Sequence, residues 1–228
     1  MAPTDVIAGG LGHQRLAGAA SGVSLSTTAA FVGLIKGTKY VDLIPRNFST
    51  AVVLRYIECP YLVVLKTRNA LAGVPVDYSD VAQDGSTNTS VVLSALPALA
   101  DGGALWIGCP VRYRGAHIDV DSANGDANNL TVDYPDASLT LTDISDTDNT
   151  DTGASLAQDG TVTWTVPTGN AWRAASLRRI CAVNNIAITA TRFDHDDDET
   201  LYWTRWSWNV AMDAATTLDH ILALNEST

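Results

Sequence analysis

The sequence predicts an all-β protein that folds as an antiparallel β-sandwich of the jelly-roll or immunoglobulin-like type. Short runs of β-branched and aromatic residues recur from residue 29 onward, which is typical of strands. Clusters of Gly, Asn, Asp and Pro separate these runs and favour turns that need a positive φ or a bond from a side chain to the backbone. No regular alternation of strands with helical segments appears, which argues against a parallel α/β sheet.

The expected strands follow one another at short intervals. Segment 161–166 shows the pattern clearly, because Val162, Trp164 and Val166 share one face while threonines occupy the other. Such alternation is typical of a strand with one buried face. The expected strands are 31–35, 39–44, 51–57, 61–65, 89–93, 104–108, 117–121, 130–134, 138–144, 161–166, 185–193 and 201–210.

Two segments have a composition that also suits a helix. They are 170–182, which reads NAWRAASLRRICA, and 210–224, which reads VAMDAATTLDHILAL. For the second, propensity alone does not distinguish a terminal helix from an outer strand, so both alternatives stay open.

The chain is expected to comprise an extended arm followed by two β modules. Residues 1–28 are rich in Gly, Ala, Ser and Thr without a sustained period, which predicts an extended N-terminal arm. A weak internal repeat relates segment 80–93 to segment 143–156. We therefore interpret residues 29–103 as an N-terminal β module and residues 104–228 as a C-terminal β-sandwich module.

The net charge of the chain argues against two classes of binding partner. Fourteen Lys and Arg oppose 25 Asp and Glu, which gives a net charge of −11 and a pI of about 4.5. This excess of negative charge argues against nucleic acid and anionic membranes as partners. The N-terminus lacks the basic and uninterrupted apolar regions of a signal peptide, and no apolar run is long enough to span a bilayer.

The three cysteines, Cys59, Cys109 and Cys181, are too far apart in sequence for a CxxC metal half-site and are odd in number. We interpret them as buried thiols, which fits assembly in a reducing cytoplasm.

Two acidic segments are candidates for weak cation binding. Segment 194–199, DHDDDE, begins with the D-x-D-x-D spacing of a calcium loop. However, Glu199 stands where that loop needs Gly, and Arg205 stands where it needs a bidentate Glu, so a solvated hairpin tip is the favoured interpretation. The same two interpretations apply to Asp143, Asp146, Asp148 and Asp151, whose Thr and Asn neighbours favour side-chain-to-backbone bonds.

The strand that follows the first acidic segment is partly apolar on both faces. Tyr202, Trp206 and Trp208 share one face, while Trp203 and Arg205 share the other. Such a strand lies in the centre of a sandwich, or its outer face meets another subunit. We expect Arg205 to extend across Trp203, to pair with an acidic loop or to lie at a protein interface.

The sequence offers no catalytic constellation. There is no G-x-S-x-G, H-E-x-x-H or phosphate-binding loop, and the four histidines (His13, His117, His195 and His220) are scattered along the chain. We therefore predict a protein that is not an enzyme, with no catalytic, cofactor-binding or metal-binding residues. Sugar binding is the alternative chemistry, with Trp172 as the one tryptophan expected in a loop, where it could stack on a glycan.

Several segments together carry a resemblance to a known class of protein. They are LWIGCPVRYRGAHIDV (105–120), NLTVDYPDASLTLTDISDTDNTDTGASLAQDGTVTWTVP (129–167), NAWRAASL (170–177) and LYWTRWSWNV (201–210). This succession of a Gly-aromatic strand, an Asp-initiated turn with paired threonines, a D-G-x-β-x-W strand and a closing Tyr-Trp-x-Arg strand resembles virion proteins of tailed bacteriophages. The resemblance covers about residues 30–210, and it departs from the pattern at VDYPDAS, where an aromatic pair is expected.

The resemblance implies a structural role as a capsid decoration or cement protein on the virion surface. Its implied partners are the major capsid protein and further copies of the same chain, as a dimer or a trimer. The alternative is a tail, baseplate or fibre-associated β-sandwich module that binds host glycans. The resemblance does not distinguish these positions in the particle.

Overall fold

A computed structural model describes residues 60–84, 86–188, 193, 195 and 199–225. The expected N-terminal arm (1–28) and the strands expected at 31–35, 39–44 and 51–57 lie outside the described residues, as does Cys59. No helix within the described ranges combines the length and the apolar character needed to cross a membrane.

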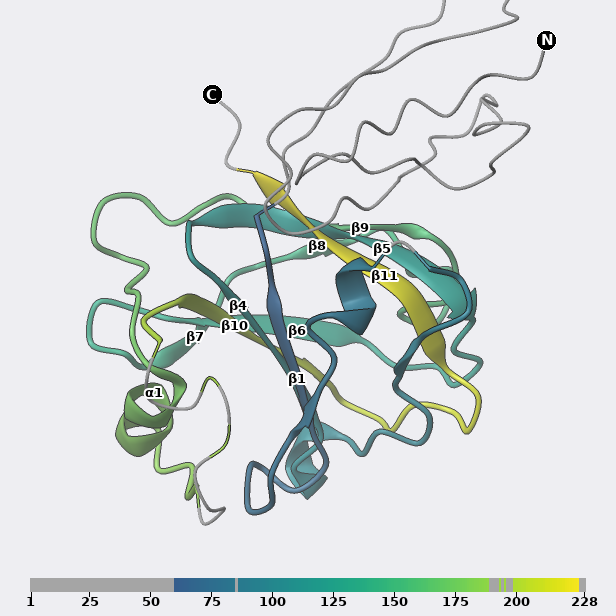
Figure 1. The fold of residues 1–228 in the computed structure, drawn as a ribbon, viewed down its shortest axis with the longest axis horizontal. Helices are drawn as coiled ribbons and strands as arrows, with labels where there is room; N and C mark the ends of the chain where they lie inside the picture. Colours follow the sequence, from purple (N-terminus) through teal and green to yellow (C-terminus); the bar gives the residue numbers. More distant parts are fainter. Residues whose placement is uncertain (1–59, 85, 189–192, 194, 196–198, 226–228) are drawn as a thin grey trace, which may run out of the picture. The chain divides into compact units, whose positions relative to one another are not determined.

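The described residues form two antiparallel sheets, which confirms the predicted all-β sandwich class (Figure 1). The six-stranded sheet has the order β2-β1-β4-β10-β6-β7, and the five-stranded sheet has the order β3-β11-β5-β9-β8. The strands are β1 (Val63–Thr67), β2 (Val76–Asp77), β3 (Val91–Val92), β4 (Ala104–Cys109), β5 (Tyr113–Ser122), β6 (Leu130–Pro135), β7 (Leu141–Asp143), β8 (Thr147–Asp148), β9 (Gly160–Thr163), β10 (Tyr202–Trp208) and β11 (Thr217–Asn225). The helical elements are η1 (Val81–Gln83), η2 (Leu99–Asp101) and α1 (Leu177–Val183).

The main hydrophobic core lies between the two sheets. On β9, Val162 is fully buried while Thr161 and Thr163 are partly exposed, so the predicted alternation is confirmed. Successive side chains of a strand point to opposite faces, but β1 and β4 are buried at every residue because both faces of their sheet are covered. The core includes Val64, Leu105, Ile107, Val132, Trp206 and Trp208 from the six-stranded sheet, and Val91, Tyr113, Ala116, Ile118, Leu218 and Ile221 from the five-stranded sheet.

A second hydrophobic cluster covers the outer face of the six-stranded sheet. Helix α1 lies on the side of this sheet that faces away from the five-stranded sheet (Figure 1). Leu177 and Ile180 of the helix belong to one buried cluster with Trp106 of β4 and Trp203 of β10. The two apolar faces of β10 are therefore explained within one chain, since β10 is a central strand between β4 and β6.

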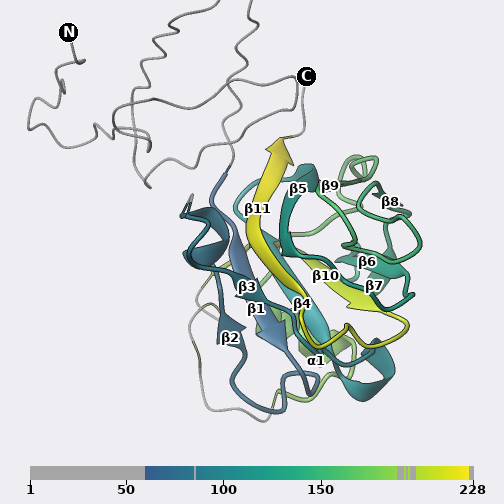
Figure 2. The ribbon, with the colours of Figure 1, turned by 90° about the vertical axis from the view of Figure 1, so that its right-hand side faces the viewer.

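The two edges of the sandwich are distinct. Strands β2 and β3 lie at one edge, and β7 and β8 lie at the other (Figure 2). At the first edge, the Lys66 ammonium on β1 donates to the carbonyl of Val92 on β3 across 2.6 Å and so connects the two sheets. At the second edge, the chain passes directly from β7 in one sheet to β8 in the other.

Residues on both sides of the expected module boundary contribute to both sheets. Strand β1 pairs with β4, and β3 pairs with β11, so segments before and after residue 103 share each sheet. Within the described residues, the ranges 60–103 and 104–225 thus build one sandwich. The part of the expected N-terminal module at 29–59 lies outside the described residues.

Three segments show where sequence pattern was ambiguous. Segment 170–182 contains most of α1, whereas segment 210–224 contains most of β11, so this segment forms a strand and not a terminal helix. The strand expected at 185–193 is wrong over residues 185–188, which have no strand structure, and residues 189–192 lie outside the described part. Ile186 and Ile188 instead pack against the outer hydrophobic cluster, which accounts for their apolar character.

Candidate functional site

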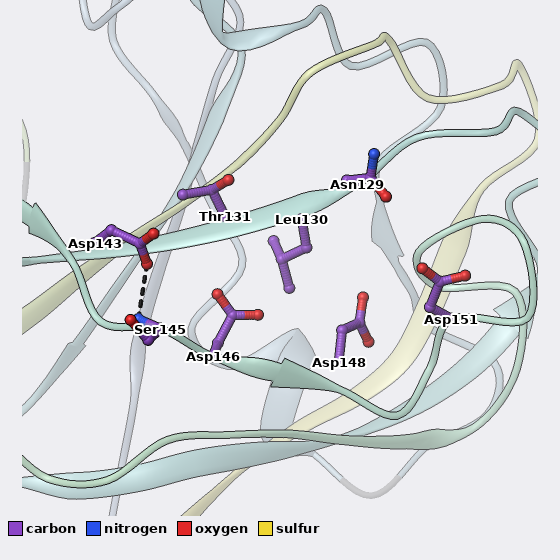
Figure 3. Close-up of a pocket in the computed structure, with 8 residues that line it drawn as sticks. All are labelled: Asn129, Leu130, Thr131, Asp143, Ser145, Asp146, Asp148 and Asp151. Atoms are coloured by element: carbon purple, nitrogen blue, oxygen red, sulfur yellow. Dashed lines mark hydrogen bonds between the residues drawn. The ribbon is translucent and has the colours of Figure 1, made fainter.

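A polar pocket lies beside the crossover from β7 to β8, at one edge of the sandwich. Its volume is about 230 Å³. The first residues of β6 form one wall, and the acidic crossover forms the other (Figure 3). The pocket is lined by Asn129, Leu130, Thr131, Asp143, Ser145, Asp146, Asp148 and Asp151.

Three of the four carboxylates in this pocket are fixed by the backbone two residues further along the chain. Asp143 accepts from the Ser145 amide at 2.7 Å, and Asp151 accepts from the Gly153 amide at 2.6 Å. Asp148 accepts from both the amide and the hydroxyl of Thr150, at 2.8 and 2.5 Å. These are Asx-turns, in which an aspartate side chain replaces a backbone acceptor. The side-chain-to-backbone bonds expected for this loop are therefore present.

The fourth carboxylate, Asp146, connects the crossover to β6. It accepts from the Val132 amide at 3.1 Å. Partial burial raises the pKa of Asp146 to about 6, and the neighbouring charges of Asp148 and Asp143 act in the same direction, while the Val132 bond opposes them. Asp146 thus changes its charge closer to neutrality than an ordinary aspartate does.

Asp148 gives the pocket a buried acceptor that has no partner. Its Oδ2 atom is buried and has no hydrogen-bond partner. A single unpaired carboxylate oxygen suits an N–H or O–H donor more than a metal ion, which needs several ligands. Among the described residues, no three His, Cys, Asp or Glu side chains gather closely enough to hold a metal ion.

The first acidic segment is only partly described. Asp194 and Asp196–Asp198 lie outside the described residues, so its expected hairpin tip stays a prediction. His195 is placed between two carboxylates, with Nδ1 at 3.0 Å from Glu199 Oε2 and Nε2 at 3.6 Å from Asp77 Oδ2. Through the second contact, His195 lies beside strand β2.

Arg205 pairs within its own sheet. It lies opposite Asp133 of β6 in the strand register, and its Nε and Nη2 atoms donate to Asp133 Oδ2 at 3.1 and 2.6 Å. Both side chains are largely buried. Of the expected roles, the structure shows pairing with an acid, but that acid belongs to the neighbouring strand and not to a loop.

The two strand histidines are brought together on the five-stranded sheet. His117 lies on β5 and His220 on β11, and His220 Nδ1 is 3.1 Å from Asp119 Oδ2. Sequence reasoning did not single out Asp119 or Asp219. The signal was present in HIDVD, because alternation places its polar residues on the face opposite Ile118. In LDH, alternation places only His220 opposite Ile221, and the position of Asp219 depends on the irregularity in the pairing of β11 with β5.

The tryptophans fill the core. Trp172 lies in a loop, as expected, but its side chain is buried, so the expectation that it could stack on a glycan is corrected. All six are buried, and Trp172 is only 2% exposed. Trp172 packs against the rings of Tyr113, Trp164 and Tyr202 at centroid distances of 5.3, 6.4 and 5.7 Å. The loop after β9 turns inward because this aromatic cluster removes a large apolar surface from water. The sugar-binding alternative therefore loses its proposed stacking residue.

Cys109 and Cys181 are buried free thiols, as expected, and burial raises the pKa of each to about 12. A thiol with so high a pKa is a poor nucleophile.

Comparison of the chain with family models, curated proteins and solved structures found no match. The proposed function is therefore based on the geometry of the described residues and on the sequence pattern.

Proposed function

We propose that this chain is a non-enzymatic structural protein of a tailed-bacteriophage virion. In this role it acts as a capsid decoration or cement protein, which binds the outer face of the major capsid shell and stabilises it. The protein is made in the host cytoplasm and functions on the capsid surface as a homo-oligomer. The sequence pattern between residues 30 and 210 supports this proposal, and one structural observation supports binding to the capsid.

That observation is a set of three exposed valines at one edge of the sandwich, which we name the valine edge: Val74, Val76 and Val92. These side chains are 60%, 47% and 39% exposed. Val76 lies on edge strand β2 and Val92 on edge strand β3. Edge strands usually carry charged or shielding residues, because an open apolar edge invites contact with another protein. The valine edge is therefore the surface proposed to contact the capsid.

The local geometry makes this edge a firm contact surface. Pro75 lies between Val74 and Val76 and lacks a backbone donor, so a further strand is not readily added there. Lys66 holds β1 against the carbonyl of Val92. A surface that is already ordered loses less conformational entropy on binding than a flexible one. Side-chain packing on a capsid protein is accordingly favoured over strand pairing.

Sedimentation of the protein with purified capsids of the encoding virus tests the proposal. We expect the protein to bind expanded shells in preference to free capsid subunits. Val76→Lys with Val92→Lys should weaken shell binding by about tenfold or more, which corresponds to about 1.4 kcal/mol. The matched control is Val183→Lys, since Val183 is 44% exposed on α1, away from the valine edge. If both variants bind shells equally well, the valine edge is not the surface that contacts the capsid. If the wild-type protein does not bind shells, the decoration role is refuted.

A further inference from the structure

Asn124, in the loop between β5 and β6, is the one asparagine of the chain that is followed by glycine. In such a pair the glycine nitrogen can attack the side-chain amide carbon of the asparagine, because glycine has no Cβ to hinder the approach. Ammonia leaves, a cyclic imide forms, and water opens the imide to aspartate or isoaspartate. Sequence alone therefore marks Asn124 as a site of rapid deamidation.

The fold places the Asn124 side chain in a closed polar network. This residue is only 2% exposed. Its Nδ2 atom donates to the carbonyls of Asp126 and Ser155 and to Oδ1 of Asn128, each at 3.0 Å. Its Oδ1 atom accepts from the amides of Asp126 and Asp213, both at 3.2 Å. The amide group that has to leave in the reaction is therefore held at both of its polar atoms.

Asp213 holds the attacking nitrogen. Gly125 is exposed, so burial does not protect it, but its amide donates to Asp213 Oδ2 at 2.7 Å. Bonds from the amides of Ala215 and Gly125 hold the pKa of the Asp213 carboxyl below its usual value. Asp213 is therefore a charged acceptor and a weak base, which orients the Gly125 N–H without removing its proton.

The same network does not accommodate the product of deamidation. A carboxylate has no hydrogen to donate, so the three oxygens that accept from Nδ2 would face another acceptor. The loop that contains Ser155 is tied to Asn124 a second time, because the Asn124 amide donates to the carbonyl of Leu156 at 3.0 Å. Ser155 in turn accepts from Trp208 Nε1 at 3.1 Å. Deamidation would thus weaken the connection between these loops and strand β10.

We propose that Asn124 is a deamidation site that the fold keeps closed through Asp213, and that it reacts only when its loop opens locally. The Gly125 nitrogen then forms a bond to Asn124 Cγ, the Cγ–Nδ2 bond breaks, and the proton of the Gly125 amide leaves with the ammonia. Water is the one co-reactant. The rate is that of the open loop multiplied by the population of the open state. This proposal goes beyond the proposed function and does not depend on it.

Peptide mapping of the full-length protein tests the proposal. The wild-type protein is incubated at mildly alkaline pH, in buffer and in urea, and mass spectrometry measures aspartate and isoaspartate at position 124 over time. We expect the folded protein to react at least about tenfold more slowly than the unfolded chain, which corresponds to an opening free energy of about 1.4 kcal/mol or more. Equal rates in buffer and urea would overturn the proposal.

A substitution at Asp213 tests the role of its carboxylate. Asp213→Ala should raise the rate at Asn124 in buffer by about tenfold, because the Gly125 amide loses its acceptor. Asp126→Ala is the matched control, since Asp126 is exposed and contacts Asn124 through its backbone atoms. A rate in Asp213→Ala that equals the wild-type rate would show that Asp213 does not hold the site closed.

A second substitution separates attack by Gly125 from general loosening of the fold. A Cβ added at Gly125 meets Asp213 Oδ2 at 3.1 Å and no other atom within 4 Å, so Gly125→Ala fits once Asp213 is alanine. We expect the double variant to return to a slow rate, because the methyl group hinders the attacking nitrogen. A double variant that reacts as fast as Asp213→Ala would overturn the proposed route. If Asp213→Ala does not fold, the comparison of the wild type in buffer and urea still decides.

Discussion

At the scale of single residues, Tyr113 holds a buried polar position in the core between the sheets. Its hydroxyl lies 2.7 Å from Thr204 Oγ1 and donates to the carbonyl of Ile107 at 3.2 Å. Tyr113→Phe removes these bonds but keeps the ring, so we expect a loss of about 1–2 kcal/mol in the free energy of unfolding. Urea denaturation measures this loss. Tyr134→Phe is the control, since Tyr134 is partly exposed, and an equal loss in both variants would contradict the role of the Tyr113 hydroxyl.

Asp146 should make stability depend on pH. Because folding raises its pKa from 3.8 to about 6, the protonated form is favoured in the folded state. Its contribution is therefore complete below pH 3.8 and is lost as the pH rises through 6. Asn at this position stays neutral and can still accept from Val132.

We therefore expect Asp146→Asn to be more stable than the wild type at pH 8, by about 1–2 kcal/mol after allowance for solvent screening, and nearly equal to it at pH 4. Thermal denaturation across this pH range measures the difference. Asp126→Asn, at an exposed carboxylate, should show no such pH-dependent gain. A constant difference at all pH values would contradict the assignment to Asp146.

At the scale of elements, the Arg205–Asp133 pair connects β10 to β6 under the outer hydrophobic cluster. Removing one partner leaves a buried charge, so Asp133→Ala should cost about 3 kcal/mol. Asp133→Leu combined with Arg205→Met replaces both charges with apolar side chains and should recover most of that loss. A double-mutant cycle with Asp133→Ala and Arg205→Ala measures the coupling. A coupling energy near zero would show that the two side chains act independently.

Strand alternation was the most informative signal in the sequence. It was clearest at β9, whose buried face alternates with threonines. Strands β4 and β10 were predicted from their β-branched and aromatic residues, because both of their faces lie in hydrophobic clusters. The sequence pattern was ambiguous for β11, where Ala, Leu and Met suit a helix but pairing with β5 determines a strand. It failed at residues 185–188, since their isoleucines serve the outer cluster without forming a strand.

The sequence predicted only part of the candidate pocket. The bonds of Asp143, Asp148 and Asp151 are local and follow from an Asp placed two residues before Ser, Thr or Gly. The contribution of β6 and the burial of Asp148 Oδ2 depend on how the sheets pack, which no local pattern specifies. The burial of Trp172 was missed for the same reason, because the composition of its loop does not reveal the aromatic cluster that buries it.

At the scale of the whole molecule, charge is unevenly distributed along the chain. The excess of acids belongs to residues 60–228, while residues 1–59 carry a small excess of cations. In the proposed role, the valine edge contacts the capsid. Shell binding through these valines should therefore change little as salt concentration rises.

Cryo-electron microscopy of virions from the virus that encodes this chain tests the decoration role. We expect regular copies of the sandwich over the outer face of the capsid, with Val74, Val76 and Val92 turned toward the shell. Density for the sandwich only at the tail tip, the baseplate or a fibre would contradict the decoration role.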